Sequence, residues 1–256
     1  MTGELNRSRE QQQNQIFKIH VMVKYVIGYF LSLLLICCCD GSHQSKTEQN
    51  TIDTLSAYKY KESGKVKSAN GDKRGAIKDY TKAILFNPDY DIAYYNRANA
   101  KMSIKNYKGA IDDYTKAIEL NEKFSQAYYN RALLKYEIGD FEGELSDYHL
   151  AIKYCEPDAD VYNNLGRALY DLERFKESVE AYGEGIKYFP EDYRLYYGRG
   201  LARKRTGDKK GACEDWIKSS ELGCIQANML LPLCDEYIKE KNDSLNKQKE
   251  EANKIE

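Results

Sequence analysis

The sequence is poor in the residues that build common metal and nucleic-acid sites. Among 256 residues there are only three histidines, four prolines and one tryptophan. No CxxC pair and no Cys/His cluster has the spacing of metal ligands, so we expect no structural metal. Neither sign of charge is in excess, because 39 basic and 40 acidic residues leave a net charge of −1. This balance argues against a nucleic-acid-binding protein, which normally carries a strongly basic field.

Motifs for catalysis are also missing. The sequence contains no GxxxxGK[ST], GxGxxG, HExxH or GxSxG string. His149 is the only histidine after residue 43, and no paired nucleophile accompanies it. We therefore expect neither an enzyme nor a cofactor, and we expect no catalytic residue.

One apolar run is present, YVIGYFLSLLLICCC at residues 25–39, preceded by Lys24. It is shorter than the roughly 20 residues that a spanning helix needs and suits the apolar part of a signal peptide. Translation from Met22 would give this segment an ordinary short basic leader. Whether the chain starts at Met1 or at Met22 stays open.

The end of this run resembles the lipobox of bacterial lipoproteins, in which a small residue precedes a cysteine that is lipidated. The resemblance implies Cys38 or Cys39 as the lipidated residue, although a cysteine stands before each of them in place of Gly, Ala or Ser. The alternative is an uncleaved helix, extended back to Val21, that anchors an array facing the cytoplasm. Both interpretations attach the protein to a membrane, the first of them in the cell envelope.

From Ala57 onward the sequence repeats itself with a period of 34 residues, as residues 94–121 and 128–155 show most clearly. Such a period indicates a stack of identical helical units. We place the units at 57–90, 91–124, 125–158, 159–192 and 193–226. The extension 1–39 is followed by a polar stretch at 40–56, expected to be a flexible linker. After the units we expect a capping helix at 227–241, kinked or split by Pro232, and a charged tail at 242–256.

Within each unit, large and small side chains occupy fixed positions. Position 4 is Tyr60, Tyr94, Tyr128, Tyr162 and Tyr196, and position 24 is Tyr80, Tyr114, Tyr148, Tyr182 and Trp216. Positions 8, 20 and 27 are mostly Ala or Gly, with Glu144 and Ser178 as exceptions at position 20. Small residues let two antiparallel helices approach, and aromatic residues fill the space beside them.

This pattern resembles the tetratricopeptide repeat. The resemblance implies an all-α fold, an α-solenoid of five helix-turn-helix repeats with a C-terminal capping helix. It also implies a scaffold that binds a protein or an extended peptide in a concave groove. In the family, this groove is built from the first helix of each repeat (helix A), at positions 2, 5, 9, 12 and 13 with position 6 beside them. The residues expected to bind the partner are Tyr95, Asn96, Asn99, Tyr129, Asn130, Tyr136, Asn163, Asn164, Tyr170 and Tyr197.

An alternative role exists for two of these tyrosines. Tyr95 and Tyr129 either face a ligand or pack between adjacent A helices. Charge also changes along the expected groove, from basic through acidic to basic, a gradient able to orient a peptide. The residues that form it are Lys61, Lys65, Glu137, Asp160, Asp171, Arg194, Lys204 and Arg205. The partner and the oligomeric state are not determined by the sequence.

Positions 7 and 23 change together. Arginine at position 7 accompanies aspartate at position 23 in the pairs Arg97 and Asp113, Arg131 and Asp147, and Arg199 and Asp215. In the fourth unit both are apolar, as Leu165 and Ala181. We therefore hypothesise an Arg–Asp pair between the two helices of a unit. The first unit, with Ser63 and Asp79, does not follow the pattern.

The cysteines near the C-terminus leave one question open. Cys213 takes a position that is Ile, Leu or Val in the other units, so it is expected to be a small core residue. In an exported protein, Cys224 and Cys234 are close enough in sequence to form a disulfide in the cap.

Overall fold

The computed structural model describes residues 41–252, with side chains from residue 49 to residue 244. The predicted signal or anchor segment, with Cys38 and Cys39, lies outside this range. Every regular element in the described range is a helix, which confirms the predicted all-α class.

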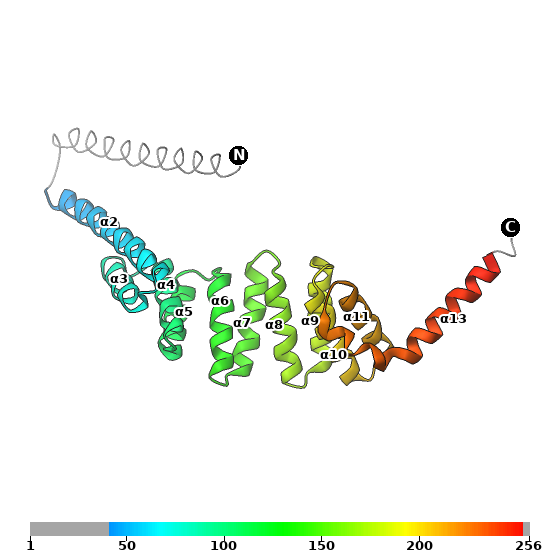
Figure 1. Cartoon of the computed structure of the whole chain (residues 1–256). Helices are drawn as coiled ribbons and strands as arrows, with labels where there is room; N and C mark the ends of the chain where they lie inside the picture. The colour runs from blue at the N-terminus through cyan, green and yellow to red at the C-terminus, as the bar shows by residue number, and fades with distance from the viewer. Residues whose placement is uncertain (1–40, 253–256) are drawn as a thin grey trace, which may run out of the picture. The chain divides into compact units, whose positions relative to one another are not determined.

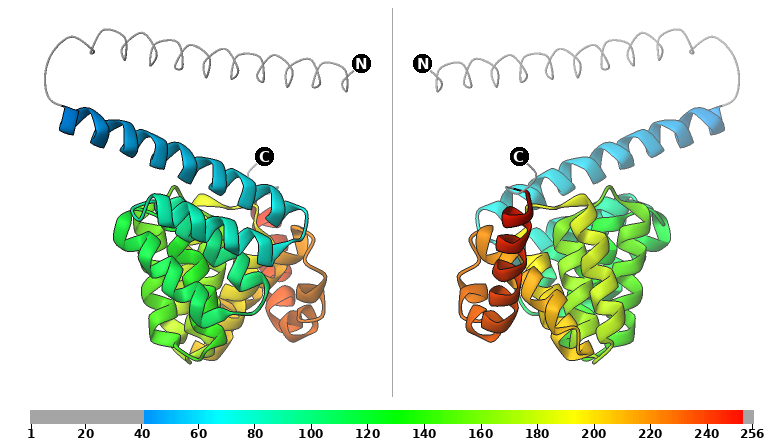
Figure 2. Two further views of the ribbon diagram at one scale, coloured as in Figure 1. Left: turned by 90° about the vertical axis from the view of Figure 1, so that its left-hand side faces the viewer. Right: turned by 90° about the vertical axis from the view of Figure 1, so that its right-hand side faces the viewer.

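Five antiparallel helix pairs follow one another along the chain, and each helix packs on its neighbours in sequence (Figure 1). The pairs are α2 (Gly41–Ala69) with α3 (Lys73–Phe86), α4 (Asp91–Ser103) with α5 (Tyr107–Leu120), α6 (Ser125–Glu137) with α7 (Phe141–Tyr154), α8 (Ala159–Asp171) with α9 (Phe175–Tyr188), and α10 (Tyr193–Thr206) with α11 (Lys209–Glu221). From Asp53 onward, within α2, the pairs belong to one compact unit. In the views of Figure 2, successive pairs stack one behind another, as expected for a solenoid.

The polar stretch before the first unit differs from the prediction of a flexible linker. Residues 41–56 are helical and continue without a break into helix A of the first unit, as α2. The reason lies in what the stretch does not contain: no proline or glycine occurs between Ser42 and Ser63 to end a helix. Low hydrophobicity alone therefore misled the prediction.

The second helix of each pair (helix B) begins after a tight turn. In four turns an Asp or Asn side chain caps the helix by accepting a hydrogen bond from a glycine N–H three residues on, as Asp140 does from Gly143. The turn also needs a left-handed residue, which is glycine in three cases, for example Gly139 with φ 81°. Lys105 and Glu173 take this conformation in the other two turns, with φ 61° and 59°.

The core follows the predicted alternation of small and aromatic residues. Ala98, Ala110, Tyr114 and Ala117 are completely buried in one unit, and their counterparts recur along the array. Small residues at position 8 are required by contact: a Cβ added to Gly166 would lie 2.6 Å from the ring of Tyr182. At this spacing even alanine forces a side chain to move.

The hypothesised Arg–Asp pairs are confirmed in all three units. In the third unit, Arg131 Nε and Nη2 donate to the two carboxylate oxygens of Asp147 at 2.8 and 2.7 Å. The same two-pronged contact joins the pairs of the second and fifth units. Each aspartate is buried, with Asp147 only 1% exposed.

A third member of this network was missed by the sequence analysis. Position 11 supplies a second cation to each aspartate, as Lys135 Nζ does to Asp147 at 3.0 Å. Lys101 and Arg203 contact Asp113 and Asp215 in the same way. The sequence signal was available, because position 11 is Lys67, Lys101, Lys135, Leu169 and Arg203.

The first and fourth units depart from this network in different ways. In the first unit, Ser63 Oγ donates to Asp79 at 2.6 Å and Lys67 pairs with the same carboxylate at 2.7 Å. In the fourth unit all three positions are apolar and buried, as Leu165, Leu169 and Ala181. The network is therefore replaced as a whole.

After the fifth unit come two short segments, α12 (Ile225–Asn228) and η1 (Leu231–Cys234), and then the 18-residue helix α13 (Asp235–Ala252). Pro232 lies in the first turn of η1. The Cys224–Cys234 disulfide that the sequence left open does not form in this structure. Cys234 is bonded to Cys213 instead, and Cys224 is a buried free thiol. Closeness in sequence is a poor guide here, because the turns around α12 carry η1 back against α11. The bond therefore joins the cap to the fifth unit.

Candidate functional site

The ten residues predicted to bind a partner lie on helices α4, α6, α8 and α10, the A helices of units two to five. They sit at equivalent positions on successive, adjacent helices. The structure brings several of them into direct contact, and it leaves others without hydrogen-bond partners.

Hydrogen bonds link the A helices of neighbouring units. Asn130 Nδ2 donates to the hydroxyl of Tyr95 at 3.1 Å, and Asn164 Nδ2 donates to the hydroxyl of Tyr129 at 3.0 Å. Each bond joins position 6 of one unit to position 5 of the unit before it. We call these two bonds the Tyr–Asn ladder.

Asn99 joins the ladder to the core of the second unit. Its side-chain oxygen accepts from Asn130 Nδ2 at 3.2 Å and from the hydroxyl of Tyr114. The polar groups at this step of the groove are therefore bonded to one another. A partner would have to compete with these bonds to use them.

The rings of Tyr95 and Tyr129 pack between neighbouring helices. Tyr95 lies 4.7 Å from the ring of Phe124 and 5.8 Å from that of Tyr114, and Tyr129 lies 6.0 Å from the ring of Tyr148. Of the two roles left open for these tyrosines, packing between helices accounts for the contacts. They therefore lie between the helices that were expected to line the groove.

Two other tyrosines carry an arginine on their rings. Tyr136 is 38% exposed, and the guanidinium of Arg167 lies 5.2 Å from its ring centre. The guanidinium of Arg205 lies 5.8 Å from the ring of Tyr170. Such stacking over an aromatic face is an attractive cation–π contact. Arg205 had been predicted only as part of the charge gradient along the expected groove, and Arg167 had not been named, although both lie on A helices.

The three remaining predicted residues differ from one another. Asn96 and Asn163 are half-buried and make no side-chain hydrogen bond within the described range, so their amides are available. Tyr197 packs against the cluster of Trp216 and Cys213 under the cap. Its ring therefore belongs to the core at the end of the array.

A buried carboxyl group lies on helix B of the third unit. Glu144 on α7 is 1% exposed, and its Oε1 has no hydrogen-bond partner among the described residues. The hydroxyl of Tyr148, on the same helix, is its neighbour. Burial raises the pKa of Glu144 to about 7; the positive charge of Arg167 and a hydrogen bond with Tyr148 oppose this rise, and the negative charge of Asp171 reinforces it.

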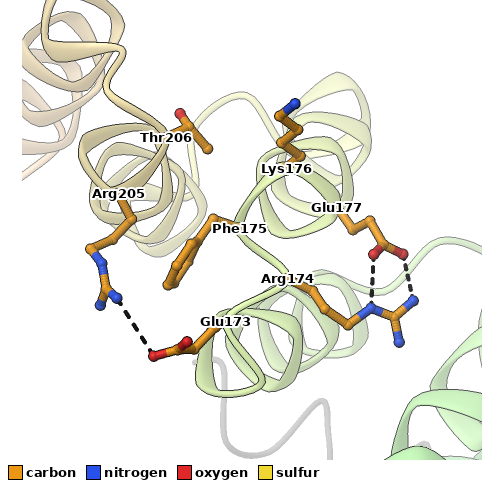
Figure 3. A pocket seen from close by; sticks show the side chains of 7 residues that line it. All are labelled: Glu173, Arg174, Phe175, Lys176, Glu177, Arg205 and Thr206. Atoms are coloured by element: carbon orange, nitrogen blue, oxygen red, sulfur yellow. Dashed lines mark hydrogen bonds and ion pairs between the residues drawn. The ribbon is translucent and has the colours of Figure 1, made fainter.

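A separate hollow of about 380 Å³ lies where the α8–α9 turn meets the end of α10 (Figure 3). It is lined by Glu173, Arg174, Phe175, Lys176, Glu177, Arg205 and Thr206.

Charges in this hollow are largely paired. Arg174 donates two hydrogen bonds to Glu177, which holds the pKa of that carboxyl below its usual value. Arg205 lies over the ring of Phe175 at 4.2 Å and 3.7 Å from Glu173. Figure 3 shows Phe175 between these two pairs. The hollow offers no unpaired buried group, so the groove remains the better candidate site.

None of the helices in the described range is both long enough and apolar enough to span a bilayer. Within the same range, no three metal-ligating side chains come together.

Comparison with known proteins places the repeats in a family. Two family models described as tetratricopeptide repeat match residues 92–124 and residues 163–221. Among curated proteins, none matches the sequence significantly.

Several solved structures share the fold. MamA is 26% identical with a TM-score of 0.59, over 62% of this chain and 93% of its own. MamA (41-end) from Desulfovibrio magneticus is 20% identical with a TM-score of 0.59, over 65% and 94%. YrrB, described as a TPR protein with an unusual peptide-binding site, is 18% identical with a TM-score of 0.58, over 64% and 84%. Residues 92–124 and 163–221 are therefore tetratricopeptide repeats, within an all-helical solenoid that these proteins share.

Proposed function

We propose that the array is a scaffold that binds an extended peptide segment of a partner protein along its A helices. The observation that carries this proposal is the mixture of side chains available there. Tyr136 offers an aromatic ring that is 38% exposed and carries Arg167 on one face, and Asn96 and Asn163 offer amides without a hydrogen-bond partner among the described residues. Aromatic faces contribute contact area and amides can bond a peptide backbone, which are the two needs of extended-peptide recognition.

Support from relatives is limited to architecture. Peptide binding is stated for YrrB, but at 18% identity the likeness extends only to the fold. The proposal therefore rests on the side chains of this chain. Tetratricopeptide repeats are a family of protein-interaction scaffolds, which supports a binding role.

The test is to select, from a displayed library of random peptides, those that bind the full-length protein. We expect enriched peptides to bind the wild-type protein and to lose binding to Tyr136→Ala combined with Asn163→Ala. The matched control is Tyr188→Ala, which removes a 55% exposed tyrosine from helix B of the fourth unit. Selection of no peptide, or equal binding to all three proteins, would contradict the proposal.

We further propose that the array is exported and held at a membrane by lipid on Cys38 or Cys39. Two observations support this: the apolar run at 25–39 has signal-peptide length, and the chain carries a Cys213–Cys234 disulfide. Structural disulfides persist in oxidising compartments and are rare in the cytosol. The disulfide thus favours export over an uncleaved anchor with a cytoplasmic array.

Labelling with radioactive palmitate separates these two alternatives. We expect the wild-type protein to take up the label and to lose the residues that precede the lipidated cysteine. The label should be lost in Cys38→Ala or in Cys39→Ala. A protein that keeps residues 25–39 and takes up no lipid would sink the lipoprotein proposal.

A further inference from the structure

We propose that the hollow between the α8–α9 turn and the end of α10 binds a carboxylate group of the partner peptide, held by Arg205. This inference rests on the proposed function and names the chemistry that the fourth and fifth units recognise. The hollow adjoins one of the predicted binding residues, because Tyr170 packs edge-on against Phe175, with 5.2 Å between the ring centres, and Phe175 lines the hollow.

The hollow is open space that a ligand group can enter. Its volume of about 380 Å³ is at the low end of the range for ligand pockets, so it suits one side chain or a chain terminus. Among its lining residues, Glu173, Lys176, Arg205 and Thr206 are exposed and Phe175 is half-buried. A ligand can therefore reach these side chains from solvent without any opening of the fold (Figure 3).

The residue at position 14 explains why there is room at this junction. In the second, third and fourth units, which like the fifth follow another unit, this position is Ile104, Ile138 and Leu172. In the fifth unit it is Thr206, whose shorter side chain leaves space beside Phe175. At the preceding junction, by contrast, Leu172 packs against the core.

The arginine is also particular to this junction. Position 13 is Ser103, Glu137 and Asp171 in the second, third and fourth units, and Arg205 in the fifth. The guanidinium of Arg205 lies 4.2 Å from the ring centre of Phe175 and 5.8 Å from that of Tyr170. Stacking on aromatic rings holds a guanidinium in place and leaves its N–H edge open. Arg205 is therefore oriented before a ligand arrives, which lowers the cost of binding.

The N–H groups of Arg205 make no hydrogen bond among the described residues. Its ion pair there is with Glu173, whose Oε1 lies 3.7 Å from Nη2, beyond hydrogen-bond distance. The two side chains are 46% and 77% exposed, and an exposed pair of this kind contributes little. A ligand carboxylate can thus accept two hydrogen bonds from the guanidinium while Glu173 turns into solvent.

The charge of the lining favours an anion. Arg174, Lys176 and Arg205 stand against two acids, Glu173 and Glu177. Arg174 and Glu177 neutralise each other through two hydrogen bonds. Lys176 makes neither a hydrogen bond nor an ion pair within the described range. A basic side chain would meet this surplus positive charge, and a neutral amide would gain less than a carboxylate from Arg205.

Glu173 occupies the hollow's cation in the free protein. It lies in the left-handed turn position, with φ 59°, where three of the other four turns have glycine. The fold therefore accepts glycine here, and the glutamate supplies a carboxylate that competes for Arg205. Glu173→Gly should bind an acidic peptide more tightly than the wild type does.

The first experiment uses the peptides selected from the random library. We expect an aspartate, a glutamate or a free C-terminal carboxylate at one constant register in peptides enriched on the wild-type protein. Synthetic versions with glutamine at the acidic position, or with an amidated C-terminus, identify which carboxylate binds. The version that lacks the bound carboxylate should bind at least about tenfold more weakly, the loss expected for hydrogen bonds to a charged group.

The second experiment measures the same peptides by fluorescence anisotropy on four variants. Arg205→Gln should lose the same factor for the acidic peptide and bind its neutral version as the wild type does. Thr206→Ile keeps the charge and fills the hollow with a residue found at this position in two other units, so it should weaken the acidic peptide to a similar extent. Glu173→Gly should tighten binding by up to about fivefold, the range that an exposed competing pair allows.

The fourth variant, Lys210→Gln, is the matched control. It removes one positive charge from an exposed site on α11 that makes no ion pair within the described range. It should bind the acidic peptide as the wild type does.

The outcomes separate the two proposals. Peptides without a fixed carboxylate, or acidic peptides that bind Arg205→Gln as tightly as wild type, overturn the carboxylate site and leave the peptide scaffold standing. So does a loss in Arg205→Gln without one in Thr206→Ile, because the arginine would then act outside the hollow. Selection of no peptide at all overturns the scaffold and the carboxylate site together.

Discussion

Removing Arg131 tests the charged network where it is most completely formed. Arg131→Leu leaves Asp147, which is 1% exposed, with Lys135 as its sole cationic partner. The variant loses hydrogen bonds of 2.8 and 2.7 Å to a buried carboxylate. Breaking a buried ion pair in this way costs about 3 kcal/mol of unfolding free energy. For a chain of this size, the midpoint of thermal unfolding should fall by roughly 6–12 °C.

Adding Asp147→Ala should recover part of this loss. The double variant removes the stranded carboxylate, so its destabilisation should be smaller, at about 1.5 kcal/mol. Arg131 also contacts Thr115 at 2.9 Å and the ring of Tyr128. These contacts are lost in both the single and the double variant, so the double-mutant cycle cancels them.

Urea denaturation followed by circular dichroism measures each term of the cycle. The matched control is Lys116→Ala, which breaks an ion pair with Glu119 that is exposed on both sides, at 44% and 58%. Exposed pairs contribute little, so this variant should unfold with the wild type. A double variant as unstable as Arg131→Leu, or a coupling energy near zero, would refute the reasoning.

Three further predictions follow from local features. Because the folded state holds the pKa of Glu144 near 7, above its ordinary value of 4.5, stability falls as pH rises through that range, by up to about 3 kcal/mol. Urea titrations between about pH 5 and pH 8 should show this slope in wild type and its loss in Glu144→Gln. Lys105→Gly relieves a left-handed φ of 61° and should raise the unfolding free energy by about 0.5–1 kcal/mol; a decrease in chemical denaturation would contradict the strain. Cys234→Ser opens the loop of 21 residues that the bond to Cys213 closes, and it should lower the unfolding free energy by about 3 kcal/mol. Chemical denaturation with and without reductant measures this loss, and reductant should destabilise the wild type but not the variant.

The sequence predicted what depends on periodicity. Tyr114 and Ala117 are buried because every unit must bring two helices together at the same positions. The pairing of Arg131 with Asp147 was predicted because the fourth unit changes both residues at once. Lys135 carried the same signal, and it was missed because only two positions were compared.

Properties that depend on the path of the chain were not predictable in this way. Cys224 was closer in sequence to Cys234 than Cys213 is, but the turns of the cap bring Cys213 to 5.6 Å from it, Cα to Cα. On the A helices, the sequence analysis assigned Tyr95 and Asn130 to the same face, and their hydrogen bond agrees with that. The sequence did not show the hydrogen bond between them, because contacts between side chains of neighbouring units depend on the distance and rotation from one unit to the next.

The apolar residues Leu165, Leu169 and Ala181, which replace the charged network in the fourth unit, affect which helices can pair correctly during folding. Helices in a repeat array resemble one another, so a helix B can compete for the helix A of another unit. If the helix that carries Ala181 packed against the helix that carries Arg131, the guanidinium would be buried without a counter-ion. If the helix that carries Asp147 packed against the helix that carries Leu165, the carboxylate would be buried without a cation. Both exchanges cost several kcal/mol, about as much as breaking a buried pair. The fourth unit thus divides the array, because its two helices accept each other and reject those of their neighbours.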